Sequence, residues 1–89
     1  MKIEFDRKFS KDFLSLPEYM QKAISDLNKA FEKASSINEI SQCKKMKGSK
    51  NLYRIRHGDY RVTLCLIDHE TIEFRRVLTR GQIYKKHVK

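Results

Sequence analysis

Two hydrophobic periods divide the chain into a helical part and a strand-like part. In the first part, one apolar stripe at helical spacing is formed by Met20, Ala23, Ile24, Leu27, Ala30, Phe31 and Ala34. From Leu52 onward, polar and apolar residues alternate with a period of two, as in strands that have one buried face. The pattern therefore predicts an α+β fold in which helices precede a sheet.

A short strand and two helices are expected in the first part. Residues 2–5 alternate as a strand does, and Asp6 is a suitable N-cap for a first helix. The apolar face of that helix contains Phe9, Phe13 and Leu16. Ser15 is expected to cap the second helix, because Pro17 fits a first turn and Glu18 completes a capping box.

Three strands are expected in the second part, over Leu52–His57, Tyr60–Ile67 and Thr71–Leu78. Turn sequences at 58–59 and 68–70 separate them, and a turn at 48–51 makes 42–47 a candidate for one more strand. Connections this short place neighbouring strands antiparallel. We therefore predict an antiparallel sheet of about four to five strands, with two N-terminal helices packed on one face. The tail 81–89 is expected to be a short strand or a helical turn, and residues 1–89 to form a single domain.

The central strand predicts which face of the sheet is covered. Its apolar positions share one side and are expected to pack on the helices; they are Tyr60, Val62, Leu64 and Leu66. The alternate positions point the other way, toward water or a ligand; they are Arg61, Thr63 and Cys65.

Arginines are expected to gather on that uncovered face. Arg54 and Arg56 share one side of the preceding strand, and with Arg61 they bring three guanidinium groups to one patch. Arg80 and Tyr84 are expected to close its edge. Guanidinium forks suit phosphate, and a tyrosine can stack on a base. A single arginine fits a solvated strand equally well, but clustered like charges cost energy unless an anion neutralises them.

The net charge of +9 lies in the second part of the chain. Residues 1–40 contain seven basic and seven acidic residues, whereas 41–89 contain thirteen basic and only four acidic ones. Charge confined to the strand-rich part indicates a surface for a polyanion such as nucleic acid. Further RNA contacts are expected from Lys44, Lys45, Lys47, Lys50, Arg76, Lys85 and Lys86, although the lysine run before the sheet also fits a solvated loop.

Other classes of site are not expected. His57, His69 and His87 are scattered and have no Cys or carboxylate at ligand spacing, so no metal or other cofactor is predicted. Cys43 and Cys65 have no disulfide framework and are interpreted as reduced thiols of a cytoplasmic protein. No apolar run has the length of a membrane span, so no membrane partner is expected.

Three segments of the second part resemble the RelE/ParE superfamily of bacterial toxins from toxin–antitoxin systems. These segments are Lys47-Gly48, LYRIRHGDYRV over 52–62 and RVLTRGQIY over 76–84. The order of the helices before the sheet matches the family as well, so the resemblance covers nearly the whole chain.

The resemblance to the RelE branch implies a toxin that enters the ribosomal A site and cuts mRNA there. In that reaction a 2′-hydroxyl attacks the adjacent phosphodiester, leaving a 2′,3′-cyclic phosphate and a 5′-hydroxyl. The resemblance implies that the catalytic residues are Arg54, Arg56, Arg61, Arg80 and Tyr84. It also implies a cognate antitoxin that forms a hetero-oligomer with the toxin.

Two departures from the family pattern affect the proton acceptor. RelE-type sites often have Lys where this chain has Arg54 and Arg56, and Arg is not a practical base. Many relatives have His where this chain has Thr79. The candidates for proton transfer are then Tyr84, His87 and His57.

Two other functions fit the same residues. The ParE branch uses this scaffold to poison DNA gyrase and need not cut RNA. A basic module that binds RNA without cutting it also accounts for the charge.

Overall fold

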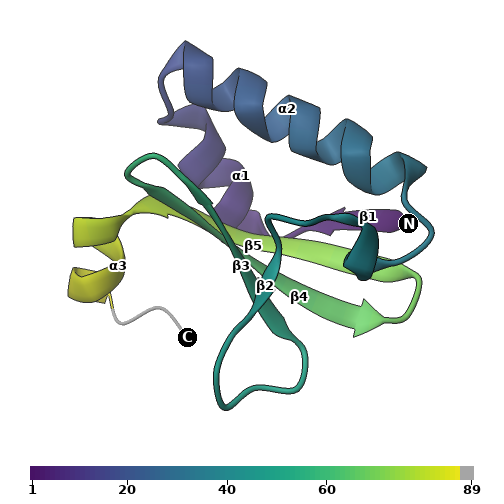
Figure 1. The fold of residues 1–89 in the computed structure, drawn as a ribbon. Helices are drawn as coiled ribbons and strands as arrows, with labels where there is room; N and C mark the ends of the chain where they lie inside the picture. The colour runs from purple at the N-terminus through teal and green to yellow at the C-terminus, as the bar shows by residue number, and fades with distance from the viewer. Residues whose placement is uncertain (87–89) are drawn as a thin grey trace.

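A five-stranded sheet, in the order β1-β5-β4-β3-β2, forms the centre of the structure (Figure 1). The computed structural model describes the backbone of residues 1–86 and the side chains of residues 1–83. Its elements in chain order are β1 (Lys2–Phe5), α1 (Arg7–Leu14), α2 (Glu18–Lys33), the 3-10 turn η1 (Ile37–Glu39), β2 (Lys44–Lys45), β3 (Leu52–His57), β4 (Tyr60–Asp68), β5 (Thr71–Thr79) and α3 (Arg80–Lys86).

The strands β2, β3, β4 and β5 are antiparallel neighbours, as the short turns predicted. The strand over residues 2–5 is confirmed, but it lies parallel to β5, with Lys2 opposite Thr71 and Phe5 opposite Phe74. No short turn connects β1 to β5, because α1, α2, η1 and three strands lie between them in the chain. The direction of β1 relative to β5 was therefore not fixed by turn length. The sheet is therefore mixed at this one edge.

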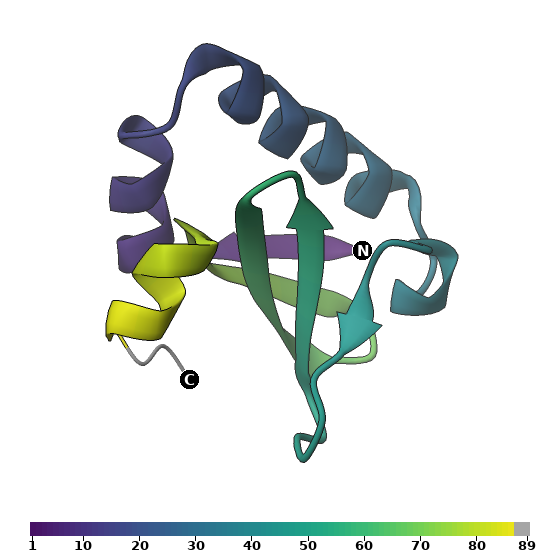
Figure 2. The same ribbon diagram turned by 60° about the vertical axis from the view of Figure 1, so that its left-hand side comes forward.

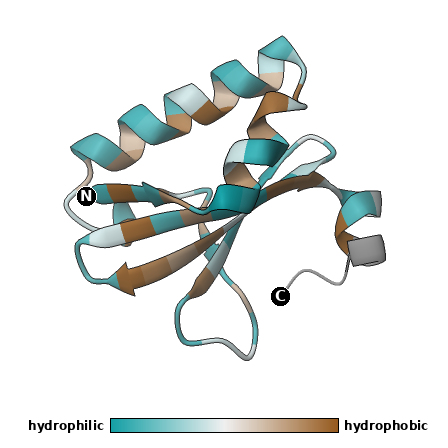
Figure 3. Cartoon of the chain, turned by 180° about the vertical axis from the view of Figure 1, so that it is seen from behind, coloured by the Kyte–Doolittle hydropathy of each residue, from teal (hydrophilic) through white to brown (hydrophobic). Residues whose placement is uncertain are grey.

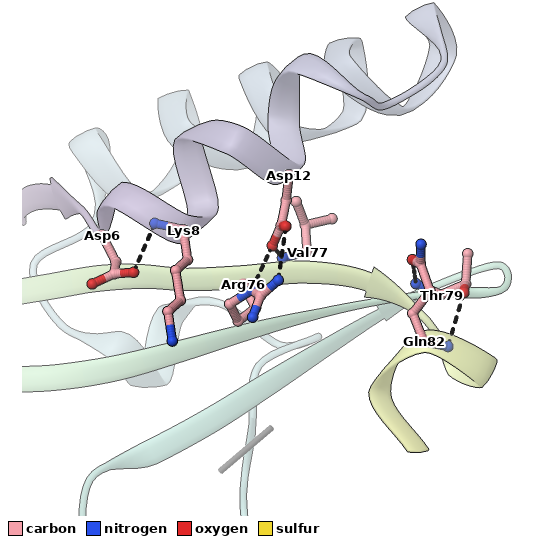
Figure 4. Close-up of polar contacts among 7 residues, drawn as sticks. All are labelled: Asp6, Lys8, Asp12, Arg76, Val77, Thr79 and Gln82. Atoms are coloured by element: carbon pink, nitrogen blue, oxygen red, sulfur yellow. Dashed lines mark hydrogen bonds and ion pairs between the residues drawn. The ribbon is translucent and has the colours of Figure 1, made fainter. Parts of the chain in front are cut away.

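The start of α1 is confirmed, whereas the predicted cap of α2 is wrong. The Asp6 carboxylate accepts a hydrogen bond from the backbone N–H of Lys8 at 2.9 Å (Figure 4). Ser15 does not cap α2; its backbone N–H donates to the backbone carbonyl of Asp12 at 3.1 Å, and Ser15 ends α1 as its C-cap. Pro17, with an extended backbone, occupies the N-cap position of α2 and supplies no side-chain hydrogen bond.

The helix α2 lies across one face of the sheet, as Figures 1 and 2 show from two directions. It buries the predicted stripe at Met20, Ile24, Leu27 and Phe31. Ala30, also assigned to the stripe, is exposed. In Figure 3 the hydrophobic segments of α2 face the sheet and the hydrophilic ones face away from it.

One aromatic side chain joins both helices to the sheet. Phe74 of β5 is fully buried, and its ring centroid lies 5.3 Å from that of Phe9 in α1 and 5.6 Å from that of Phe31 in α2. Edge-to-face contacts of this kind add to the free energy gained from burying the rings. Around them the strands contribute Ile55, Val62, Leu64, Ile72 and Val77. The core therefore lies on the helix-covered side of the sheet.

The tail after β5 is a helix, α3, which begins with a capping box. The Thr79 hydroxyl accepts from the N–H of Gln82 at 3.2 Å, and the Gln82 amide oxygen accepts from the N–H of Thr79 at 2.9 Å (Figure 4). This reciprocal pair satisfies two backbone donors at the helix start. Because α3 follows β5 without a loop, the cap fixes the direction in which the chain leaves the sheet.

An ion pair covers the edge of β5 beyond the end of β1. The Asp12 carboxylate of α1 accepts from Nε of Arg76 at 2.8 Å and from its Nη2 at 3.0 Å (Figure 4). The same carboxylate accepts from the backbone N–H of Val77 at 3.1 Å, in the place of a strand partner. Hydrogen bonding by Asp12 raises the pKa of Arg76 further above its ordinary value. This forked contact joins α1 to β5.

We expect Asp12→Ala to lower the free energy of unfolding by about 2–4 kcal/mol, because it leaves the Arg76 guanidinium and the Val77 N–H without their partner. Urea denaturation followed by circular dichroism measures this change. The matched control is Arg75→Ala, since Arg75 is more exposed and lies 3.8 Å from Glu73. Arg75→Ala should lower the free energy of unfolding by no more than about 1 kcal/mol. Equal losses in the two variants would contradict a special contribution from Asp12.

Candidate functional site

The register of β3 against β4 brings four polar residues to one face of the sheet. Ile55 lies opposite Val62, and both are buried beneath the helices. The alternate pairs therefore project from the opposite face. These pairs are Arg54 with Thr63 and Arg56 with Arg61. The predicted convergence of arginines from two strands is therefore present in the structure.

A groove of about 320 Å³ lies on this face, which we call the arginine groove. It is lined by Met46, Arg54, Arg56, Arg61, Thr63, Arg80 and Ile83. Arg80 enters it as the first residue of α3, and its N–H donates to the carbonyl of Asp59 in the turn between β3 and β4 at 2.9 Å. That bond and the capping box of α3 hold the fourth arginine beside the other three.

The arginine groove concentrates positive charge with little internal compensation. Arg56 and Arg61 are directly opposite each other, a like-charged pairing that destabilises a sheet. The Arg61 guanidinium donates to the carbonyls of Gly58 and Tyr60, each at 3.1 Å, so neutral oxygens hold it in place. Within residues 1–83, the strand arginines of the groove form no ion pair, and no residue that lines the groove is acidic. The site is therefore suited to an anion from outside.

The lysines that were expected to contact RNA do not all lie on the face that carries the groove. Lys44 lies opposite Arg54 and so extends the cationic face, whereas Lys45 lies opposite Tyr53, which packs toward the core. Lys47 and Lys50 are exposed in the segment between β2 and β3. Lys44 is thus the one member of this lysine run that the strand register places beside the groove.

Two sequence candidates lie away from the groove. Arg76 was expected to contact RNA, but its guanidinium is held by Asp12 and its side chain is 14% exposed. His57 was a candidate for proton transfer, yet strand alternation places it on the same side as Ile55, and it lines a separate cavity with residues of α2. Neither residue is among those that line the arginine groove.

The C-terminal candidates lie at the limit of what the structure describes. The backbones of Tyr84, Lys85 and Lys86 belong to α3, but their side chains lie outside the described residues. His87 lies outside them altogether. Their expected roles therefore stay predictions.

The face that carries the groove is not uncovered throughout, which corrects the expectation of an open surface. Leu78 lies opposite Arg61 and is 3% exposed, and α3 packs against β4 and β5. Cys65 is also buried. Because α3 covers part of this face, the exposed cationic surface is reduced to a groove.

Three lining residues were missed from the sequence. Thr63 shares the face of Arg61 by alternation, so its position was visible although no role was given to it. Met46 and Ile83 come from irregular or helical segments, whose orientation no strand period predicts. The capping box of α3 had a recognisable signal, Thr79-x-x-Gln82, which would have favoured a helix in the tail.

The structure gives no support to other chemistry in the part of the chain that it describes. Burial raises the pKa of the Cys43 thiol to about 11, which keeps it protonated and unreactive near neutral pH. No group of three or more His, Cys, Asp or Glu side chains within residues 1–83 is placed to bind a metal ion. No helix in the described chain combines the length and the apolar character that a membrane span requires.

The sequence matches a described family over most of its length. Residues 3–84 match the family described as ParE toxin of type II toxin-antitoxin system, parDE. The chain is 39% identical over 85 residues to Toxin RelE3 of Methanocaldococcus jannaschii, and the match covers 94% of this chain and 96% of that protein.

Solved structures with the same fold include toxins bound to antitoxins. The RelB-RelE antitoxin-toxin complex from Methanococcus jannaschii has a toxin chain that is 36% identical, with a TM-score of 0.80 and coverage of 91% of this chain and 94% of that one. The archaeal RelE-RelB complex from Pyrococcus horikoshii OT3 gives a TM-score of 0.71 at 24% identity and covers 91% and 96% of the two chains. The second likeness shows the fold alone.

We expect sulfate to raise the unfolding temperature of this protein more than chloride does at equal ionic strength, because an anion in the arginine groove stabilises the native state by mass action. The variant Arg56→Gln relieves the repulsion with Arg61, so its free energy of unfolding without sulfate should be about 0.5 kcal/mol higher than that of the wild type. It should also show a smaller sulfate shift. Differential scanning fluorimetry measures both effects.

The matched control for this measurement is Lys22→Gln, which removes one positive charge from an exposed position of α2. It should keep the full sulfate shift, including the general salting-out contribution. An equal reduction in both variants would contradict a specific anion site.

Proposed function

The chain belongs to the ParE toxin family of type II toxin–antitoxin systems, and on that premise we propose that it inhibits translation as a ribosome-dependent mRNA endonuclease. The observation that carries the proposal is the arginine groove, in which arginines from β3, β4 and α3 line one recess on the side of the sheet away from α1 and α2. A guanidinium cluster of this kind matches the charge and the oxygen geometry of a polynucleotide backbone.

The groove supports phosphodiester cleavage by stabilising charge. When the 2′-hydroxyl oxygen attacks the adjacent phosphorus, the bond from phosphorus to the 5′-oxygen breaks, and negative charge accumulates on the phosphoryl oxygens. Arg61 and Arg80 are assigned to the scissile phosphate, and Arg54 and Arg56 to the neighbouring backbone. Because Arg61 is already held by two carbonyls, little reorganisation is needed when the charge develops.

Proton transfer needs a group other than these arginines. The 2′-hydroxyl must lose a proton and the 5′-oxygen must gain one, but a guanidinium stays protonated throughout the physiological range. With His57 placed beside α2, the remaining candidates from the sequence are Tyr84 and His87. Tyr84 is also assigned to stacking on, or orienting, a nucleotide.

A cognate antitoxin is the proposed protein partner. The similar toxins of known structure from Methanococcus jannaschii and Pyrococcus horikoshii are bound to RelB antitoxins. A chain with a net charge of +9 and one cationic face is complementary to an acidic, partly disordered protein that folds on binding. We propose that the antitoxin masks the arginine groove or displaces α3.

The match to ParE toxins favours a second candidate function, inhibition of DNA gyrase through protein contacts. The groove residues argue for RNA cleavage, whereas the lack of a histidine or carboxylate among the described residues that line it argues for a binder. A gyrase supercoiling assay separates the two functions, since inhibition without RNA cleavage would reverse the ranking.

We expect this protein to create new mRNA 5′ ends in a translating extract, as detected by primer extension, and Arg61→Ala to lower the rate of cleavage about 10²- to 10³-fold. The matched control is Arg75→Ala, which removes an arginine of β5 that does not line the groove and should cut normally. The unfolding temperature of each variant is measured in parallel. Absence of new ends with the wild type, or unchanged cutting by Arg61→Ala, would count decisively against the proposal.

We expect the protein to co-purify with the product of an adjacent reading frame when the two are co-expressed. The complex should also protect mRNA from cleavage in the same extract, because the antitoxin neutralises the cationic face. Size-exclusion chromatography and the primer-extension assay measure these outcomes. Two proteins that elute independently would refute the partnership.

A further inference from the structure

One residue stands out in the row of side chains that crosses the cationic face. The pairing of β2, β3, β4 and β5 places Lys44, Arg54, Thr63 and Arg76 opposite one another in sequence across the sheet. Three of the four are basic, although the Arg76 guanidinium is paired with Asp12 away from the groove, and Thr63 is the uncharged member of the row. It lines the arginine groove directly beside Arg54.

The hydroxyl of Thr63 is buried and has no hydrogen-bond partner within the described residues. A buried hydroxyl without a partner is unfavourable, and such groups are uncommon in native proteins. The cationic side chains around Thr63 carry donors and no acceptors. The hydroxyl proton therefore requires an acceptor from outside this row.

The other buried side-chain oxygen without a partner in residues 1–83 has different surroundings. Oδ1 of Asn28 lies in α2, and Asn28 lines an apolar recess between the two helices with Phe9, Phe13 and Ile24. It is an acceptor and has no cluster of charge beside it. Of these two buried oxygens in residues 1–83, the Thr63 hydroxyl is the one that combines a proton without an acceptor with a groove that attracts anions.

We propose that the Thr63 hydroxyl donates a hydrogen bond to a phosphate oxygen of RNA bound in the arginine groove, beside the contact made by Arg54. Threonine hydroxyls are common ligands of nucleic-acid phosphates. This role rests on the proposed function, because it assumes that the groove holds an RNA backbone. It adds a neutral, short-range contact that positions a phosphate among groups that otherwise act through charge.

The surrounding side chains explain how a buried hydroxyl becomes accessible to a phosphate. Arg54 and Arg56 are exposed and unpaired within the described residues, so they can swing toward a ligand. Arg61 is held by the carbonyls of Gly58 and Tyr60 and keeps its place. Formation of this contact therefore requires the arginine side chains to move aside so that a phosphate oxygen can reach the Thr63 hydroxyl.

The test is Thr63→Val, which replaces the hydroxyl by a methyl group of similar shape. The probe is a short fluorescein-labelled single-stranded RNA with 2′-O-methyl groups, which cannot be cut, and binding is measured by fluorescence anisotropy at several salt concentrations. We expect affinity to fall about ten- to a hundredfold, as for a lost hydrogen bond to a charged group. The unfolding temperature should stay equal or rise, because an unsatisfied polar group has been removed.

The salt dependence separates this contact from those of the arginines. Thr63→Val should leave the slope of log affinity against log salt unchanged, because it removes no charge. Arg54→Gln should reduce the slope by about one. Thr63→Ser keeps a hydroxyl and should restore most of the affinity. Thr71→Val removes a hydroxyl of β5 that bonds Asp68 instead of lining the groove, and it should bind RNA as the wild type does.

Several outcomes overturn the inference. These are wild-type protein that does not bind the probe at low salt, Thr63→Val that binds as the wild type does, and Thr63→Ser that binds as weakly as Thr63→Val. A fall in unfolding temperature with unchanged binding would assign the hydroxyl to a structural water instead. Because the probe cannot be cut, failure of the wild type to cleave mRNA would overturn the proposed nuclease function while the binding result still decides the role of Thr63.

Discussion

The turn at Gly58 and Asp59 sets the register of β3 against β4, and the cationic face depends on that register. Two residues connect the strands, so His57 pairs with Tyr60 and each earlier residue has a defined partner. Gly58 has a φ of +59°, in the left-handed region that glycine enters without strain. A slip of one residue would exchange the faces, moving arginines toward the core and Ile55 toward water. Burial of the helix-covered face therefore enforces the gathering of arginines on the other.

The structure divides its arginines between two tasks that differ in electrostatic cost. Arg76 is satisfied within the chain by Asp12 and fastens α1 to the edge of β5. The strand arginines of the groove lack carboxylate partners within the described residues, and two of them face each other. That repulsion is a standing cost which a bound polyanion or an acidic partner removes. The aromatic contacts around Phe74 stabilise the fold and so offset the repulsion between the two arginines.

Period and turn length predicted most of the sheet from the sequence, because each strand has one buried face and short connections. The same alternation located the groove residues of β3 and β4. It failed where pairing departs from regularity. In β5, Arg75 is an extra residue between the partners of Thr63 and Leu64, so a strict period of two does not hold across this point of the strand. The pairing of Arg76 with Asp12 joins residues 64 positions apart, so no local sequence pattern predicts it. The parallel placement of β1 was likewise invisible, since no tight turn constrains it.

The pairing of β1 with β5 has a consequence for the order in which the molecule is completed during synthesis. Because Lys2 pairs with Thr71, a nascent chain cannot close its sheet until Thr71 has emerged from the ribosome, and it cannot complete the groove until Arg80 has emerged. Chains abandoned part-way through translation would lack α3 and one wall of the recess. The topology thus postpones completion of the arginine groove until the chain has been synthesised as far as α3.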